Sequence, residues 1–295
     1  MHPDSSTGMV SAMSNTAPMV SVIIPTFNRN GMLKDAVDSV LDQEYGNTEL
    51  IVVDDGSTDA TVRMLSAYQN RLRLIRQENR GVSSARNAGI RAAAGTLIAL
   101  LDSDDLWLPG KLRAQVDYFE AHPEALICQT EEIWIRNGVR VNPGKRHRKE
   151  AGDIFERSLA MCLVSPSAVM MRKSLLGEVG LFDESLTACE DYDLWLRIAW
   201  KHPVHLIDTP LIIKRGGHAD QLSRMPELDK YRIRSICNLL DRGCLSPSQE
   251  EASVGMLKTK CAIYAQGCRK RGRDEDALYY DLLAGRYESC GNSRK

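Results

Sequence analysis

Short apolar runs alternate with amphipathic stretches over the first hundred residues of the chain. The apolar runs are rich in β-branched residues and predict strands at 20–24, 50–53, 72–75 and 96–101. The stretches between them carry apolar residues at helical spacing and predict helices at 31–42, 57–70 and 83–93. Continuously apolar strands separated by helices of this length are typical of βαβ units. We therefore predict an α/β fold, a mostly parallel sheet flanked by helices.

The pattern becomes less regular after residue 109. A helix is predicted at 111–121, and a strand at 126–135 runs into Asn137-Gly138, a strong hairpin signal. Shorter elements follow, namely strands at 165–170, 204–207 and 211–214 and a helix at 191–200. The last part of the chain predicts helices at 227–242, 248–271 and 275–288. We expect one domain over 19–225 and a helical C-terminal region over 226–295.

The N-terminal 18 residues are small and polar. They lack the basic start and the apolar centre of a signal peptide, so we predict a disordered leader. No window of the sequence approaches the roughly 20 apolar residues that span a bilayer. We expect a cytoplasmic protein, and peripheral contact with the inner face of the membrane stays open.

Charge and cysteine content narrow the classes of function. The 295 residues include 38 Lys and Arg and 39 Asp and Glu, a net charge of −1. Because no basic excess attracts polyanions, nucleic acid is excluded as a partner. The eight cysteines include no C-x-x-C pair, the usual spacing of zinc and thioredoxin-like sites, which favours a reduced protein.

Carboxylates gather where the predicted strands end. Asp54 and Asp55 follow the second strand, and Asp102, Asp104 and Asp105 follow the fourth. In open α/β sheets, ligands bind beyond these carboxyl ends. Carboxylates close together repel one another unless a cation lies between them, and hard divalent ions prefer oxygen ligands. The pattern predicts Mg²⁺ or Mn²⁺ together with a phosphate-bearing substrate.

The sequence lacks the motifs of three other nucleotide-binding or metal-binding classes of protein. A dinucleotide fold needs G-x-G-x-x-G after its first strand, where this chain has Pro25–Arg29. No P-loop string occurs, and the six histidines are scattered rather than clustered as in zinc hydrolases.

Five motifs then occur in one order: Ser21–Arg29 (SVIIPTFNR), Val53–Ser57 (VDDGS), Gly81–Gly89 (GVSSARNAG), Leu101–Asp105 (LDSDD) and Glu190–Trp195 (EDYDLW). Over roughly residues 19–220 the chain resembles family 2 glycosyltransferases of the GT-A fold. The resemblance implies a Rossmann-like domain. Its nucleotide-binding half would cover about 19–108 and its acceptor half about 109–225.

The resemblance also implies roles for individual residues. The positions that match donor-binding residues of the family are Pro25, Thr26, Asp54, Arg86, Asn87 and Asp102. Asp104 matches the metal ligand, and Asp55 and Asp105 match supporting positions. His218 lies where relatives have a loop near the diphosphate, so it is either a metal or phosphate contact or an ordinary loop histidine.

The pair Glu190-Asp191 matches the catalytic-base motif of the family, with Glu190 in support. Asp191 shares helical spacing with Leu194 and Ile198, which places it on the buried stripe of a helix and Asp193 off that stripe. A helix N-terminus favours the ionised carboxylate. A base of this kind suits removal of a proton from an acceptor hydroxyl.

The implied reaction is a metal-dependent single displacement that inverts the anomeric configuration of the sugar. The sugar would move from a UDP-sugar to a glycan, lipid-linked or protein acceptor in cell-surface glycan synthesis. Q-x-x-R-W, a signature of processive synthases, is absent from the sequence. Two alternatives remain: a sugar nucleotidyltransferase, and a non-catalytic nucleotide-sugar-binding or scaffold protein. The C-terminal helices suit homo-oligomer formation, acceptor docking or membrane contact, and the sequence does not decide among them.

Overall fold

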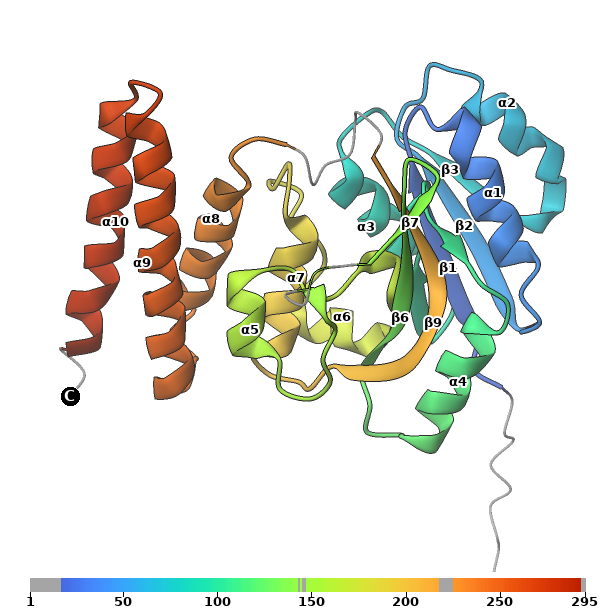
Figure 1. Ribbon diagram of the computed structural model, residues 1–295. Coiled ribbons are helices and arrows are strands. Elements are labelled where there is room, and N and C mark those ends of the chain that lie inside the picture. The colour runs from blue at the N-terminus through green and yellow to red at the C-terminus, as the bar shows by residue number, and fades with distance from the viewer. Residues whose placement is uncertain (1–16, 143, 145–146, 218–224, 293–295) are drawn as a thin grey trace, which may run out of the picture.

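The computed structural model describes residues 17–142, 144, 147–217 and 225–292 (Figure 1). Nearly all of the predicted leader and His218 therefore lie outside the described residues. Among the described residues, no helix is long and apolar enough to cross a membrane.

The first half of the domain is a series of βαβ units. Its elements are β1 (Val20–Thr26), α1 (Asn30–Leu41), β2 (Thr48–Asp54), α2 (Thr61–Leu65), a 3₁₀ segment (Ser66–Arg71), β3 (Arg73–Arg76), α3 (Val82–Ala92) and β4 (Leu97–Leu100). The four strands lie in the order β3-β2-β1-β4, and all neighbours are parallel. Their carboxyl ends therefore meet at one edge of the sheet, as the apolar pattern predicted.

The helix expected at 57–70 is shorter than predicted. Asn28 holds its first residues, because its side-chain Oδ1 accepts a hydrogen bond from the backbone N–H of Thr58 and its own N–H donates to Ser57 Oγ, both at 2.9 Å. Helix α2 begins only at Thr61, whose N–H donates to Asp59 Oδ1. The 3₁₀ segment is interrupted at Gln69, which has φ 46°.

The second half extends the sheet with antiparallel pairs and with one parallel pair, β6 and β9. Its elements are β5 (Leu106–Trp107), α4 (Lys111–Ala121), β6 (Ile127–Arg136), β7 (Val139–Val141), α5 (Phe155–Ala160), β8 (Val169–Arg172), α6 (Lys173–Val179), α7 (Glu190–Ala199) and β9 (His205–Gly216). The sheet order continues β4-β8-β6-β9-β5, and β7 pairs with β6 through the predicted turn at Asn137-Gly138. The two strands expected at 204–207 and 211–214 form the single strand β9, whose register against β6 shifts near Thr130.

Helices cover both faces of the sheet, and this explains why its strands are continuously apolar. Ile23 belongs to the core on the face of α3, α6 and α7, whereas its neighbour Ile24 belongs to the core under α1 and α4. Helix α3 lies very close to β1, since a Cβ on Gly89 would come 2.4 Å from Ile23 Cγ2. The predicted α/β fold, a sheet flanked by helices, is confirmed.

Three helices follow the domain: α8 (Leu228–Asp241), α9 (Pro247–Arg269) and α10 (Asp274–Asn292). Figure 1 shows α9 and α10 as a long hairpin at the side away from β1–β3, with α8 between that hairpin and α7. The core on the α7 face continues into these helices through Ile236 and Leu257. Cys261 and Cys268 are buried in the same core, so their seven-residue spacing reflects helix packing.

Candidate active site

The acidic motif forms a tight turn directly after β4. The backbone N–H of Asp105 donates to the carbonyl of Asp102 at 3.0 Å, and carboxylate oxygens of Asp102, Asp104 and Asp105 lie within 4.8 Å of one another. The turn brings the carboxylates of Asp102 and Asp104 together, and it adds that of Asp105. Three carboxylates at this separation form a donor set that suits a hard divalent cation.

Asp105 ties the turn to the rest of the domain. Its buried carboxylate accepts a hydrogen bond from Ser167 Oγ at 2.6 Å and another from the backbone N–H of Arg215 at 2.9 Å. Burial, and secondly the nearby charge of Asp104, raise the pKa of Asp105 to about 8. Arg215 also donates from Nε to the carbonyl of Asp104, so β9 holds the acidic turn in place.

Arg86 joins the acidic turn to helix α7. Its guanidinium is buried and donates to Asp102 Oδ1 at 2.7 Å and to Glu190 Oε1 at 2.6 Å. Burial opposes its charge, but the two carboxylates outweigh burial and raise the pKa of Arg86. Burial in turn raises the pKa of Glu190, and Arg86 opposes that rise. The bidentate fork of arginine suits a position that must hold two carboxylates at fixed angles.

Asp191 lies in the first turn of α7, next to Glu190. Its Oδ1 accepts from the N–H of Tyr192 at 2.7 Å, and its Oδ2 accepts from the thiol of Cys162 at 3.4 Å. The carboxylate is half-buried and lines a cavity of about 270 Å³ together with Asp102, Asp104, Asp105, Arg86 and Pro25. Asp191 and the acidic turn therefore face the same space.

The prediction that Asp193 lies off the buried stripe is wrong. Asp193 is 5 % exposed and pairs with Arg197 at 2.8 Å. Helix α7 is packed between the domain and α8, so it presents almost no face to solvent. Arg197 also donates to the carbonyls of Val179 and Leu181. Asp193 therefore balances the charge of the buried Arg197, whereas Asp191 faces the cavity.

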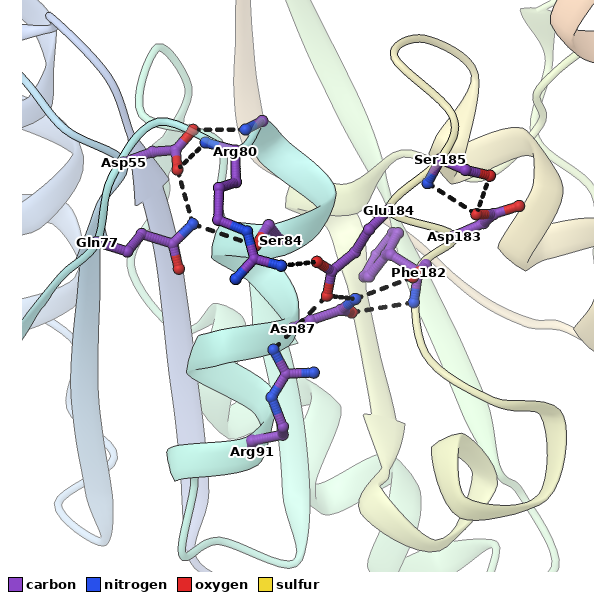
Figure 2. Close-up of polar contacts among 11 residues, drawn as sticks. Asp55, Gln77, Arg80, Ser84, Asn87, Arg91, Phe182, Asp183, Glu184 and Ser185 are labelled. Carbon is purple, nitrogen blue, oxygen red and sulfur yellow. Dashed lines mark hydrogen bonds and ion pairs between the residues drawn. The ribbon is translucent and has the colours of Figure 1, made fainter.

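At the ends of β1 and β2, Pro25 lines this cavity, whereas Thr26 and Asp54 are not part of its lining. Thr26 and Asp54 are buried, and Asp54 accepts from the N–H of Ser57 at 3.1 Å. The hydroxyl of Thr26 has no hydrogen-bond partner within the described part of the chain. Asp55 supports the turn that leads into α3, because it accepts from the backbone N–H groups of Arg80 and Gly81 (Figure 2).

Asn87 does not turn toward the cavity, although the sequence predicted that it would face the nucleotide beside Arg86. Figure 2 shows its amide directed at the segment 182–184. Nδ2 donates to the carbonyl of Phe182 at 2.9 Å and to Glu184 Oε1 at 3.0 Å, while Oδ1 accepts from the N–H of Phe182. Successive residues on a helix point about 100° apart, so Arg86 and Asn87 face different partners.

A second cavity of about 420 Å³ lies on the other side of Asp191. The two cavities share the lining residues Cys162, Asp191, Lys214, Arg215 and Arg232. The second is otherwise lined by residues of β6 and β9, by the segment 161–165, and by Val141, His147 and Lys149. Asp191 therefore forms part of the wall between two neighbouring chambers.

A comparison with protein families now identifies the chain. The model of "Glycosyl transferase family 2" matches residues 21–180, which include β1, the acidic turn and the segments that carry Arg86 and Asp105. The chain belongs to glycosyl transferase family 2. It is therefore a glycosyltransferase by family.

Relatives of this glycosyltransferase include bacterial proteins of similar length. An uncharacterized glycosyltransferase, RP339, from Rickettsia prowazekii is 32% identical over 73% of this chain and 70% of its own. The UDP-Glc:alpha-D-GlcNAc-diphosphoundecaprenol beta-1,3-glucosyltransferase WfgD from Escherichia coli is 31% identical over 67% of this chain and 76% of its own. The crystal structure of S. aureus TarS 1-349 in complex with UDP-GlcNAc has a TM-score of 0.71 and 21% identity, covering 90% and 81% of the two chains. That likeness shows the same fold.

Several residues of this glycosyltransferase site were not predicted from the sequence. Cys162, Lys214 and Ser167 contact or line the site, but each lies outside the recognised motifs. Glu184, which binds Asn87 and Arg80, has no local signal either. A single cysteine or serine in an apolar segment is typical of a buried core position. No local pattern therefore indicated a role for Cys162 or Ser167.

Proposed function

We propose that this glycosyltransferase moves a sugar from a UDP-sugar to an acceptor hydroxyl in cell-surface glycan or glycoconjugate synthesis, with inversion at the anomeric carbon. The observation that carries the proposal is the position of Asp191, which faces the acidic turn across one cavity and borders a second. The acceptor is a glycan, a lipid-linked saccharide or a protein. Residues 19–108 would hold the donor and 109–225 the acceptor.

The donor site would lie where β1, β2 and β4 end. Pro25 lines the cavity, and the unpartnered hydroxyl of Thr26 offers a hydrogen bond within the described residues. Asp54 suits the uracil imide or ribose hydroxyls, which donate hydrogen bonds to a carboxylate. Arg86 holds Asp102 in a fixed orientation for the ribose. UDP as the nucleotide agrees with the UDP-Glc named as the donor of WfgD and with the UDP-GlcNAc bound in the TarS complex.

A divalent cation, Mg²⁺ or Mn²⁺, fits the acidic turn. Asp104 would be its main protein ligand, with Asp102 beside it, because both are half-exposed to the cavity while Asp105 is committed to Ser167 and Arg215. When bound, the cation stabilises negative charge on the departing diphosphate. His218 stays a proposed metal or phosphate contact.

Asp191 would act as the general base. Its place at the N-terminus of α7 favours the ionised carboxylate, and Glu190 is held away from this task by Arg86. As the acceptor hydroxyl transfers its proton to Asp191, its oxygen attacks the anomeric carbon and the bond to the diphosphate breaks on the opposite side. No covalent bond to the protein forms, so the configuration of the sugar inverts.

Calorimetric titration tests the donor site directly. The purified protein is titrated with UDP, dTDP, GDP and CDP, each with and without Mn²⁺. We expect UDP to bind with micromolar affinity only when Mn²⁺ is present. Absence of binding for every nucleotide would overturn the proposal. Nucleotide binding without hydrolysis or transfer of any UDP-sugar would favour the scaffold alternative.

A further inference from the structure

The second cavity differs from the first in its charge. Its lining includes two carboxylates, Glu132 and Asp191, and five cationic side chains, namely Arg136, Lys149, Lys214, Arg215 and Arg232. The first cavity carries five carboxylates, namely Asp102, Asp104, Asp105, Glu190 and Asp191, and five cationic side chains, namely Arg29, Arg86, Lys214, Arg215 and Arg232. The charges that line the first cavity therefore balance, whereas the second cavity has an excess of cations.

Three of the five cations already have carboxylate partners. Lys149 pairs with Glu132 at 2.8 Å, and it also donates to the carbonyl of Thr130. Arg215 and Arg232 pair with Asp35 and Asp229, which lie outside the lining of this cavity.

Lys214 and Arg136 differ from these three. Within the described residues neither makes an ion pair, and the one hydrogen bond from the Nζ of Lys214 goes to the hydroxyl oxygen of Ser165, at 3.3 Å. Burial opposes the charge of Lys214, but Glu132 and Asp105 hold its pKa above the usual range of lysine. Arg136 is exposed at the rim. Of the cations that line the cavity, the two without an ion pair among the described residues are therefore the half-buried Lys214 and the exposed Arg136.

Trp134 provides a flat apolar surface between these charges. Its Nε1 donates to Glu132 Oε1 at 2.6 Å, which fixes the orientation of the indole. The Nζ of Lys214 lies 5.7 Å from the ring centroid, and the ring of His147 lies 5.3 Å from it on a tilted plane. A rigid aromatic face beside a few placed polar groups is typical of small-molecule sites.

We propose that the second cavity binds the acceptor, and that the acceptor is a saccharide with a phosphate ester beside the sugar ring that packs on Trp134. The proposal rests on the function proposed above, because the attacking hydroxyl must reach Asp191 from the side opposite the diphosphate. Lys214 and Arg136 would bind the phosphate, since cations at two points of the wall match a group with more than one negative charge.

Tryptophan fluorescence of the full chain tests this site, with UDP and Mn²⁺ present to occupy the first cavity and also without them. The probes are N-acetylglucosamine 1-phosphate, methyl N-acetylglucosaminide and methyl glucuronide. We expect only the sugar phosphate to change the emission, and Trp134→Phe to remove that change. Equal binding of the neutral glycoside, or binding of the glucuronide alone, would overturn the phosphate assignment.

A substitution at the exposed Arg136 tests binding of the phosphate without changing the buried core. Arg136→Gln should weaken binding of the sugar phosphate about tenfold, the effect of losing one charge-assisted contact. Arg140→Gln removes the same charge from β7, outside the cavity lining, and should change nothing. Equal effects of the two variants would overturn the proposal. Calorimetry with UDP is read separately, so loss of nucleotide binding would count against the proposed function and not against this cavity.

Discussion

The thiol of Cys162 donates to Oδ2 of Asp191 at 3.4 Å, on the wall that both cavities share. Burial, and secondly the charge of Asp191, raise the pKa of Cys162 well above its usual value, so the sulfur keeps its proton. A protonated thiol is a weak donor, and here it orients a carboxylate without neutralising it. Cys162 is therefore a positioning residue for the proposed base.

Replacement of Cys162 by alanine should slow transfer modestly. Loss of one weak hydrogen bond corresponds to a factor of about 2 to 5 in rate. Because the thiol orients the proposed base and does not touch the donor site, we expect kcat to fall while the affinity for UDP stays unchanged. The measurements are kcat and calorimetric titration with UDP. Cys244→Ala, an exposed cysteine far along the chain, is the control, and an unchanged kcat in Cys162→Ala would contradict the role.

Asp191 and Asp193 should respond differently to the same change. Asp191→Asn removes the proposed base and should lower kcat by about 10²–10⁴ while UDP binding persists. Asp193→Asn weakens a buried pair with Arg197 and should lower the melting temperature more than the rate. Transfer assays and thermal melts of both variants compare the two roles. Near-normal transfer by Asp191→Asn would remove Asp191 from the mechanism.

The metal proposal concerns Asp104. Asp104→Ala should abolish the Mn²⁺-dependent part of UDP binding, because it removes a central carboxylate of the acidic turn. Titration of UDP with and without Mn²⁺ measures this. Asp117→Ala, on the exposed face of α4, is matched in charge and should bind as the parent does. Unaltered metal dependence in Asp104→Ala would place the cation elsewhere.

Lys111 makes stability depend on pH. It is completely buried, its Nζ donates to Gln115 Oε1 at 2.5 Å and lies 4.0 Å from the ring centroid of Trp107, and burial lowers its pKa to about 7. Between pH 7 and 10 the unfolded chain binds more protons than the folded one, so the free energy of unfolding should rise with pH. The difference approaches about 4 kcal/mol over that range.

Lys111→Met should remove this slope and raise stability near pH 7. Urea unfolding of the parent and of Lys111→Met at pH 7 and near pH 10 gives the comparison. We expect the curves of the parent to separate with pH more than those of the variant. Equal pH dependence in both proteins would show that Lys111 is not the group responsible.

The sequence by itself determined the kind of fold and most of the chemistry. Its apolar runs predicted β1, β2 and β4 and the helices between them, because the periodicity of a strand or helix is visible in residues close together in the sequence. The order of five motifs pointed to the family, and the polar residues after each strand marked the edge where the site lies. The acidic turn and Asp191 were both named from these local patterns.

The tertiary structure decided which side chains meet. Arg86 and Glu190 are separated by 104 residues along the chain, and Asp105 and Arg215 by 110, so no local pattern pairs them. The same holds for Asn87 with Phe182 and for the buried Asp193, whose partner Arg197 binds carbonyls of the segment 179–181. Periodicity depends on residues that are a few positions apart in the sequence. Contacts, cavities and the charges that line them depend on how distant segments pack, and only folding brings those segments together.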